Sequence, residues 1–98
     1  MKIIENYTAP TTDDLTNLRK ALGFQGEDMA HLAGVSGSSQ WRKYTGGAEP
    51  RKMSLHMLFY TAARLTLPEH EILQVLDKMR EIGATFDYND TSKKTEEQ

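Results

Sequence analysis

The sequence predicts an all-α fold, a compact bundle of four to five helices, on three observations. Apolar residues recur at helical spacing, as at Leu15, Leu18 and Leu22. Glycine or proline separates these amphipathic segments. A chain of 98 residues is long enough for one small core. We therefore predict an N-terminal arm over residues 1–10, one folded domain over 11–84, and a polar, disordered tail over 85–98.

The first helix is expected to start at residues 11–14, which read Thr-Thr-Asp-Asp. A threonine can cap the helix, and the acidic residues of the first turn suit the helix dipole. Gly23 should end this helix. The preceding arm contains Ile3, Ile4 and Tyr7, and three interpretations stay open for it: an edge strand, an arm packed on the core, or disorder.

The second and third helices are short. The second is predicted to begin near Gln25 or Gly26. The third is predicted over residues 37–45, with Trp41 and Tyr44 facing inward at i, i+3. Aromatic residues at this spacing could also form a stacking platform for a single-stranded nucleic acid, but core packing explains them better. Apolar residues that the second helix should bury are Met29, Ala30 and Ala33, and Gly46-Gly47 should end the third helix.

Two longer amphipathic helices are predicted in the second half of the chain. Ser54 should cap the fourth helix, Pro68 should occupy the first turn of the fifth, and Gly83 should end it. The inward stripe expected on the fourth helix consists of Leu55, Leu58, Phe59, Ala62 and Leu65. The apolar face expected on the fifth helix consists of Ile72, Val75, Leu76, Met79 and Ile82.

Residues 26–47 have the pattern of a helix-turn-helix, with two short amphipathic segments around a glycine-bearing turn. Small residues at Ala30 and Gly34 allow the two helices to approach each other. The second helix of the motif carries small polar and basic side chains, which can donate hydrogen bonds into a DNA groove.

Charge is distributed unevenly along the chain. The whole sequence has a formal net charge of −2, but residues 36–66 carry five basic residues and one acidic residue. Residues 1–35 and 67–98 are acidic, with net charges of −2 and −4. An acidic body with one basic face would orient the protein on a polyanion.

These residues resemble the lambda-repressor-like, Cro/XRE-type family of helix-turn-helix transcriptional regulators over roughly residues 13–67. The resemblance rests on Leu18–Phe24 and on Ala30, Ala33-Gly34-Val35-Ser36, Trp41-Arg42, Tyr44 and Gly47. It implies a compact all-helical domain, usually dimeric, whose third helix enters the major groove. The chain departs from the family in two places: one extra residue lies between Val35 and the third helix, and Gly26 replaces a phosphate-clamping glutamine. Gln25 could substitute for that glutamine.

Under this alignment the resemblance implies two sets of DNA contacts. The base-reading residues would be Ser38 and Ser39 on the leading turn of the third helix, with Arg42 and Lys43 one turn further on. The phosphate-binding residues would be Gln25, Ser36, Gln40, Arg51 and Lys52, assisted by the backbone N–H groups at the start of the third helix.

We therefore expect a sequence-specific regulator that binds a double-stranded DNA operator, acting as a small bacterial, phage or mobile-element repressor. We also expect a homodimer, a cytoplasmic location and association with the nucleoid through DNA. Candidate dimer contacts are Leu67, Leu73, Met57 and Tyr60. The alternative function is a protein-binding module with the same fold, such as the antitoxin of a toxin–antitoxin pair, whose partner would be a toxin or another regulator.

Several other classes of protein do not fit the sequence. Cysteine is absent, and no run reaches the roughly 18 apolar residues of a membrane span. The N-terminus lacks a signal-peptide pattern. The three histidines have no metal-ligand spacing, and no serine has the pattern of a catalytic nucleophile. We accordingly expect no metal, no cofactor and no enzymatic activity.

Overall fold

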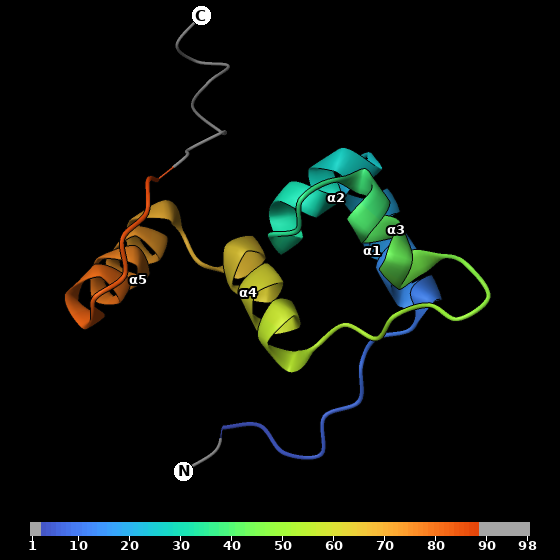
Figure 1. The fold of residues 1–98 in the computed structure, drawn as a ribbon, viewed down its shortest axis with the longest axis horizontal. Helices are drawn as coiled ribbons and strands as arrows, with labels where there is room; N and C mark the ends of the chain where they lie inside the picture. Colours follow the sequence, from blue (N-terminus) through green and yellow to red (C-terminus); the bar gives the residue numbers. More distant parts are fainter. Residues whose placement is uncertain (1–2, 89–98) are drawn as a thin grey trace, which may run out of the picture. The chain divides into compact units, whose positions relative to one another are not determined.

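The computed structural model describes residues 3–88, which form five α-helices and no strand (Figure 1). It divides the chain into a first unit that ends at Leu67 and a second unit that begins at Pro68. The all-α prediction is confirmed, and the single domain expected over 11–84 is shared between the two units. The helices are α1 (Thr12–Leu22), α2 (Gly26–Ala33), α3 (Ser38–Thr45), α4 (Leu55–Thr66) and α5 (Glu69–Ile82).

Local capping determines where the helices begin and end. The Asp14 backbone N–H donates to the Thr11 hydroxyl (3.1 Å), and the Thr11 N–H donates to the Asp14 carboxylate (2.9 Å). This reciprocal pair is a capping box, and it satisfies donors that a helix start leaves unpaired. Gly23 ends α1 in the left-handed conformation, with φ 69°. The Ser54 hydroxyl caps α4 by accepting from the Met57 N–H (3.1 Å), as predicted.

The core of the first unit is centred on α2, which packs against both α3 and α4, while α1 packs against α3. Half of the residues of α2 are buried, because a short helix between several neighbours has little surface left for solvent. The predicted inward face of α1 is confirmed. Residues of the core are Leu15, Met29, Ala30, Leu32, Ala33, Trp41 and Met53, with Leu18, Leu22, Phe24, Val35, Tyr44, Met57 and Leu58 packed around them.

The inward stripe predicted for α4 is wrong in part. Phe59, Ala62 and Leu65 are exposed, and Thr61 is the buried residue of this helix. The Thr61 hydroxyl donates to the Met57 carbonyl (2.8 Å), which satisfies its polar group inside the helix. Since α4 is apolar around most of its circumference, its periodicity alone did not distinguish the face that packs from the face that does not.

The N-terminal arm forms no strand within its described residues. It is attached to the first unit at Tyr7, whose hydroxyl donates to the backbone carbonyl of the buried Met53 (2.7 Å). Desolvation raises the pKa of Tyr7. Ile3 and Ile4 stay exposed.

The second unit consists of α5 and the described residues that follow it. Pro68 is the N-cap residue of α5, one position before the first turn in which we expected it, and Gly83 ends the helix, as predicted. The Arg80 guanidinium lies 4.4 Å from the centre of the Phe86 ring, and the Tyr88 hydroxyl donates to the Glu69 carboxylate (3.2 Å). Phe86 and Tyr88, which belong to the expected disordered tail, therefore contact α5, and residues 89–98 lie outside the described residues.

The apolar face predicted for α5 exists, but α5 contains no buried residue. Three large apolar side chains of this face are exposed: Val75, Met79 and Ile82. Among the described residues, no helix has the length and apolar character needed to cross a bilayer.

Candidate nucleic-acid interface

The candidate site is built on α2, α3 and the turn of residues 34–37 between them (Figure 1). Gly34 ends α2 with φ 77°, and its N–H donates to the carbonyls of Ala30 and His31. The Val35 N–H also donates to the Ala30 carbonyl (3.0 Å), which closes a glycine-type helix stop. The side chain of Val35 packs against the core. Both backbone hydrogen bonds and apolar packing therefore hold this turn in place.

A side chain at position 34 would meet α4. A Cβ atom there would lie 3.1 Å from Cε2 of Tyr60, closer than ordinary van der Waals contact. Two features therefore favour glycine at position 34: the positive φ and the tight approach of the Tyr60 ring.

Trp41 sets the rotation of α3 about its axis. Its side chain is 2% exposed, and Tyr44, one turn later, is half-buried against the same core. The two ring centres are 6.5 Å apart and tilted by 40°. The prediction that both aromatic residues face inward is confirmed.

The opposite side of α3 presents part of the predicted base-reading set. Ser39, Arg42 and Lys43 are exposed, and Ser39 and Lys43 lie one turn apart. Ser38 and Gln40 are half-buried and lie toward the edges of this face. Gln40, which we expected as a phosphate contact, is only partly accessible to solvent, because it borders the aromatic side of the helix.

A carboxylate occupies the N-terminus of α3. The Ser38 N–H donates to Oε2 of Glu27 (3.2 Å), and a Cβ built on Gly37 would lie 3.7 Å from Oε1 of the same side chain. We expected the first N–H groups of this helix to bind a phosphate. One of these donors is already satisfied by Glu27, whose negative charge also offsets the positive end of the helix dipole.

The loop before α4 adds two further basic side chains. The Arg51 N–H donates to the Lys43 carbonyl (2.6 Å), which ties this loop to the last turn of α3. The buried Met53 anchors the same loop in the core. We call the four exposed basic residues of α3 and this loop the basic patch: Arg42, Lys43, Arg51 and Lys52.

The two remaining predicted phosphate contacts, Gln25 and Ser36, are both exposed. Gln25 precedes α2 as its N-cap residue, and its N–H donates to the Asp28 carboxylate (2.9 Å). Ser36 lies in the turn before α3. The Asp28 carboxylate thus lies at the start of α2, and the Glu27 carboxylate lies at the start of α3. The basic side chains of α3, Arg42 and Lys43, lie in its last turn.

Arg64 has a structural role that the sequence did not reveal. It belongs to the basic segment 36–66, but its guanidinium donates to the carbonyls of His31 (2.6 Å) and Leu32 (2.9 Å). The guanidinium also lies 5.5 Å from the centre of the Tyr60 ring. It thus satisfies carbonyls at the negative end of α2. The only signal in the sequence was the lack of lysine or arginine in the last turn of that helix.

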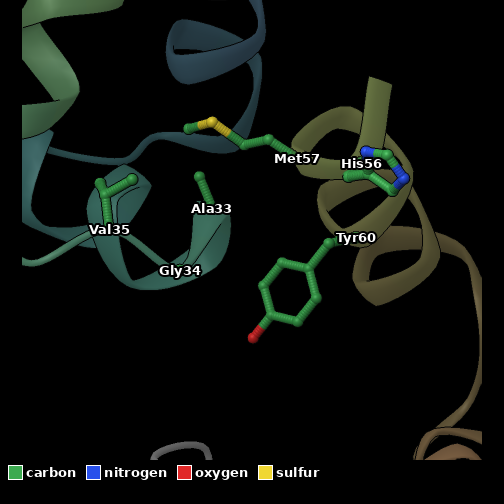
Figure 2. Close-up of a pocket in the computed structure, with 6 residues that line it drawn as sticks. All are labelled: Ala33, Gly34, Val35, His56, Met57 and Tyr60. Carbon is green, nitrogen blue, oxygen red and sulfur yellow. The ribbon is translucent and has the colours of Figure 1, made fainter. Parts of the chain in front are cut away.

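A surface pocket of about 410 Å³ lies where α2 and its following turn meet α4. Figure 2 shows the Tyr60 ring extending beside the turn and the Met57 side chain reaching toward α2. The pocket is mainly apolar, with His56 at its α4 side, and its lining residues are Ala33, Gly34, Val35, His56, Met57 and Tyr60. Within the described part of the chain, no group of three or more histidine, aspartate or glutamate side chains is arranged to hold a metal ion.

Comparisons of this chain with protein-family models, with curated proteins and with solved structures found no match.

Proposed function

We propose that this protein is a sequence-specific, double-stranded-DNA-binding regulator in which α3 reads the major groove. The observation that carries the proposal is the burial of Trp41 on one side of α3, which leaves Ser39, Arg42 and Lys43 on the other. A short helix with small polar and basic side chains on its exposed face fits the width and the hydrogen-bonding groups of that groove.

The basic patch gives this proposal its electrostatic component. Arg42 and Lys43 belong to α3, and the hydrogen bond from Arg51 to Lys43 holds the loop with Arg51 and Lys52 beside them. Side chains on α3 would read base edges, and those on the loop would bind phosphates without regard to sequence. Glu27 would disfavour a phosphate at the start of α3 and so limit non-specific binding.

The test is a binding titration of the full chain against an operator selected from a random DNA library. Arg42→Ala is expected to weaken binding to that operator by about 1–3 kcal/mol, the value of a bidentate base contact, with a smaller loss on scrambled DNA. Equal losses on the two DNAs would make Arg42 a phosphate contact. Failure to select any sequence, together with binding that does not respond to salt, would overturn the proposed function.

A second candidate function, a protein-binding module such as an antitoxin, is favoured by the exposed side of α4. Phe59 and Tyr60 are 58% and 49% exposed, and Tyr60 also borders the pocket of Figure 2. Arg64 is the only residue of α4 that carries a full charge, and its guanidinium binds the end of α2. Phe59→Ser separates the two functions, since it should abolish binding of a protein partner and leave DNA affinity unchanged.

A further inference from the structure

The N-terminal arm bends at Asn6, immediately before Tyr7. Asn6 has φ 57°, and within the described part of the chain it is the one non-glycine residue with a positive φ. Asparagine tolerates this left-handed conformation better than most residues, because its short amide side chain can form local hydrogen bonds. The sequence therefore places a residue that permits the bend directly before the aromatic residue that contacts the first unit.

Tyr7 connects this bend to the loop between α3 and α4. Its hydroxyl donates to the Met53 carbonyl (2.7 Å), although the two residues are 46 positions apart in the sequence. The Tyr7 side chain is half-buried, and Met53 is 1% exposed. A carbonyl beside the core needs a hydrogen-bond donor, and the phenol of Tyr7 supplies one. The arm thus fixes the backbone of the loop at Met53.

The loop that Tyr7 contacts carries half of the basic patch. Arg51 and Lys52 are exposed and directly precede Met53. The Arg51 N–H donates to the Lys43 carbonyl in the last turn of α3. Two residues further on, Tyr7 binds the Met53 carbonyl. The two basic side chains of the loop therefore lie between two points of attachment, one supplied by α3 and the other by the arm.

We propose that Tyr7 is a positioning residue, which holds Arg51 and Lys52 in the arrangement that binds DNA phosphates. This inference rests on the proposed function. A loop that is already in its binding conformation binds more tightly, because the apparent affinity falls in proportion to the fraction of molecules in that conformation. Tyr7 acts through the backbone of the loop and does not itself touch the DNA.

Tyr7→Phe tests the inference, since it removes the hydroxyl and keeps the ring. Binding of the full chain to scrambled double-stranded DNA is expected to weaken about three- to tenfold, within the range of one net hydrogen bond. In an Arg51→Ala, Lys52→Ala background the same substitution is expected to have no further effect, because the side chains through which Tyr7 acts are gone. An equal loss in the two backgrounds would make Tyr7 a general support of the fold and would overturn the proposal.

Trypsin provides a readout that does not depend on DNA. It cleaves after Arg51 and Lys52 when the loop opens locally, and Tyr7→Phe is expected to speed this cleavage by a similar factor. Thr61→Val is the matched control, because it also removes a hydroxyl from the first unit. That hydroxyl donates to the Met57 carbonyl within α4, so cleavage of the loop should keep its native rate. Unchanged cleavage of the loop in Tyr7→Phe would overturn the proposal.

The bend at Asn6 offers a second pair of variants that leave Tyr7 in place. Asn6→Gly permits a positive φ and should match the native chain in both assays. Asn6→Val, which is β-branched, disfavours that conformation and should reproduce the effects of Tyr7→Phe. If the native chain does not bind DNA but Tyr7→Phe still speeds cleavage of the loop, the proposed function is overturned, and Tyr7 remains the residue that holds the loop.

Discussion

Gly34 is the residue on which the connection between α2 and α3 depends. Its φ of 77° is in the left-handed region, and a Cβ would lie 3.1 Å from the Tyr60 ring. Gly23 has nearly the same backbone conformation, with φ 69°, but a Cβ there would meet no atom within 4 Å. A substitution at Gly23 therefore tests the backbone conformation alone, whereas a substitution at Gly34 tests the backbone conformation and the contact with Tyr60 together.

We predict that Gly23→Ala lowers the free energy of unfolding by about 1–2 kcal/mol, the cost of a left-handed alanine. Gly34→Ala should lose about 1 kcal/mol more, because Tyr60 must move. Urea denaturation of both variants measures the difference, and a Tyr60→Ala background should remove it. If the two substitutions lower the free energy of unfolding equally in the native background, the Tyr60 ring moves aside without a measurable loss of stability.

A second residue-scale prediction concerns Trp41 and Gln40. Trp41→Ala should lower the free energy of unfolding by about 3–5 kcal/mol, since it removes a buried aromatic side chain. Gln40→Ala, at the edge of the same helix, should stay within about 0.5 kcal/mol of the native value. A native-like urea midpoint for Trp41→Ala would contradict the rotation of α3 and move the exposed face away from Arg42.

At the scale of single elements, the capping box of α1 makes stability depend on pH. Hydrogen bonds from the Thr11 backbone and side chain hold the pKa of Asp14 below its ordinary value of 3.8. A carboxyl whose pKa is lower in the folded chain than in the unfolded chain stabilises the fold above the unfolded value. That contribution is lost as the pH falls through the folded pKa.

We therefore expect Asp14→Ala to be less stable than the native chain at neutral pH, and the difference to shrink below pH 3.8. Thermal unfolding followed by circular dichroism between neutral and acid pH measures this. Asp13→Ala is the control, since it removes a charge from the same first turn without removing the capping carboxylate. A difference that persists at low pH would show that Asp14 contributes through packing.

The loop before α4 supports a prediction about salt. If Arg51 and Lys52 bind phosphates, replacing both by alanine should reduce the slope of log affinity against log salt by about 1–2 units. The loss should be similar on operator and scrambled DNA. A Lys20→Ala, Lys78→Ala chain removes the same charge from exposed positions outside the basic patch and should keep the native slope. An unchanged slope in the loop variant would place this loop away from DNA.

On the scale of the whole molecule, burial differs sharply between the two units. Four of the eight residues of α2 are buried, whereas α5 has no buried residue in 14. Helices with few buried apolar contacts open at a low free-energy cost, and their amide hydrogens exchange quickly. The two units should therefore differ in local stability.

Native-state hydrogen exchange should show fast exchange along α5 and slow exchange along α2 in a dilute sample. Protection of α5 equal to that of α2 at low concentration would contradict the difference in burial.

Much of the first unit was predictable because the causes are local. Thr11, Ser54 and the stops at Gly23 and Gly34 act on residues within one helical turn, so their roles are visible in a short window of sequence. The inward position of Trp41 followed from the same local periodicity, and the exposed face that carries Arg42 and Lys43 followed from Trp41.

By itself, then, the sequence determined the helices, their ends and the register of α3. Only the tertiary structure decided which hydrogen bonds form between groups that are distant along the chain. Arg64 satisfies carbonyls more than 30 residues earlier, and Glu27 takes the Ser38 donor that we had expected to serve a phosphate. It also decided which face of α4 is covered. Apolar side chains lie on most sides of α4, so the shape of the neighbouring core decides which of them are covered.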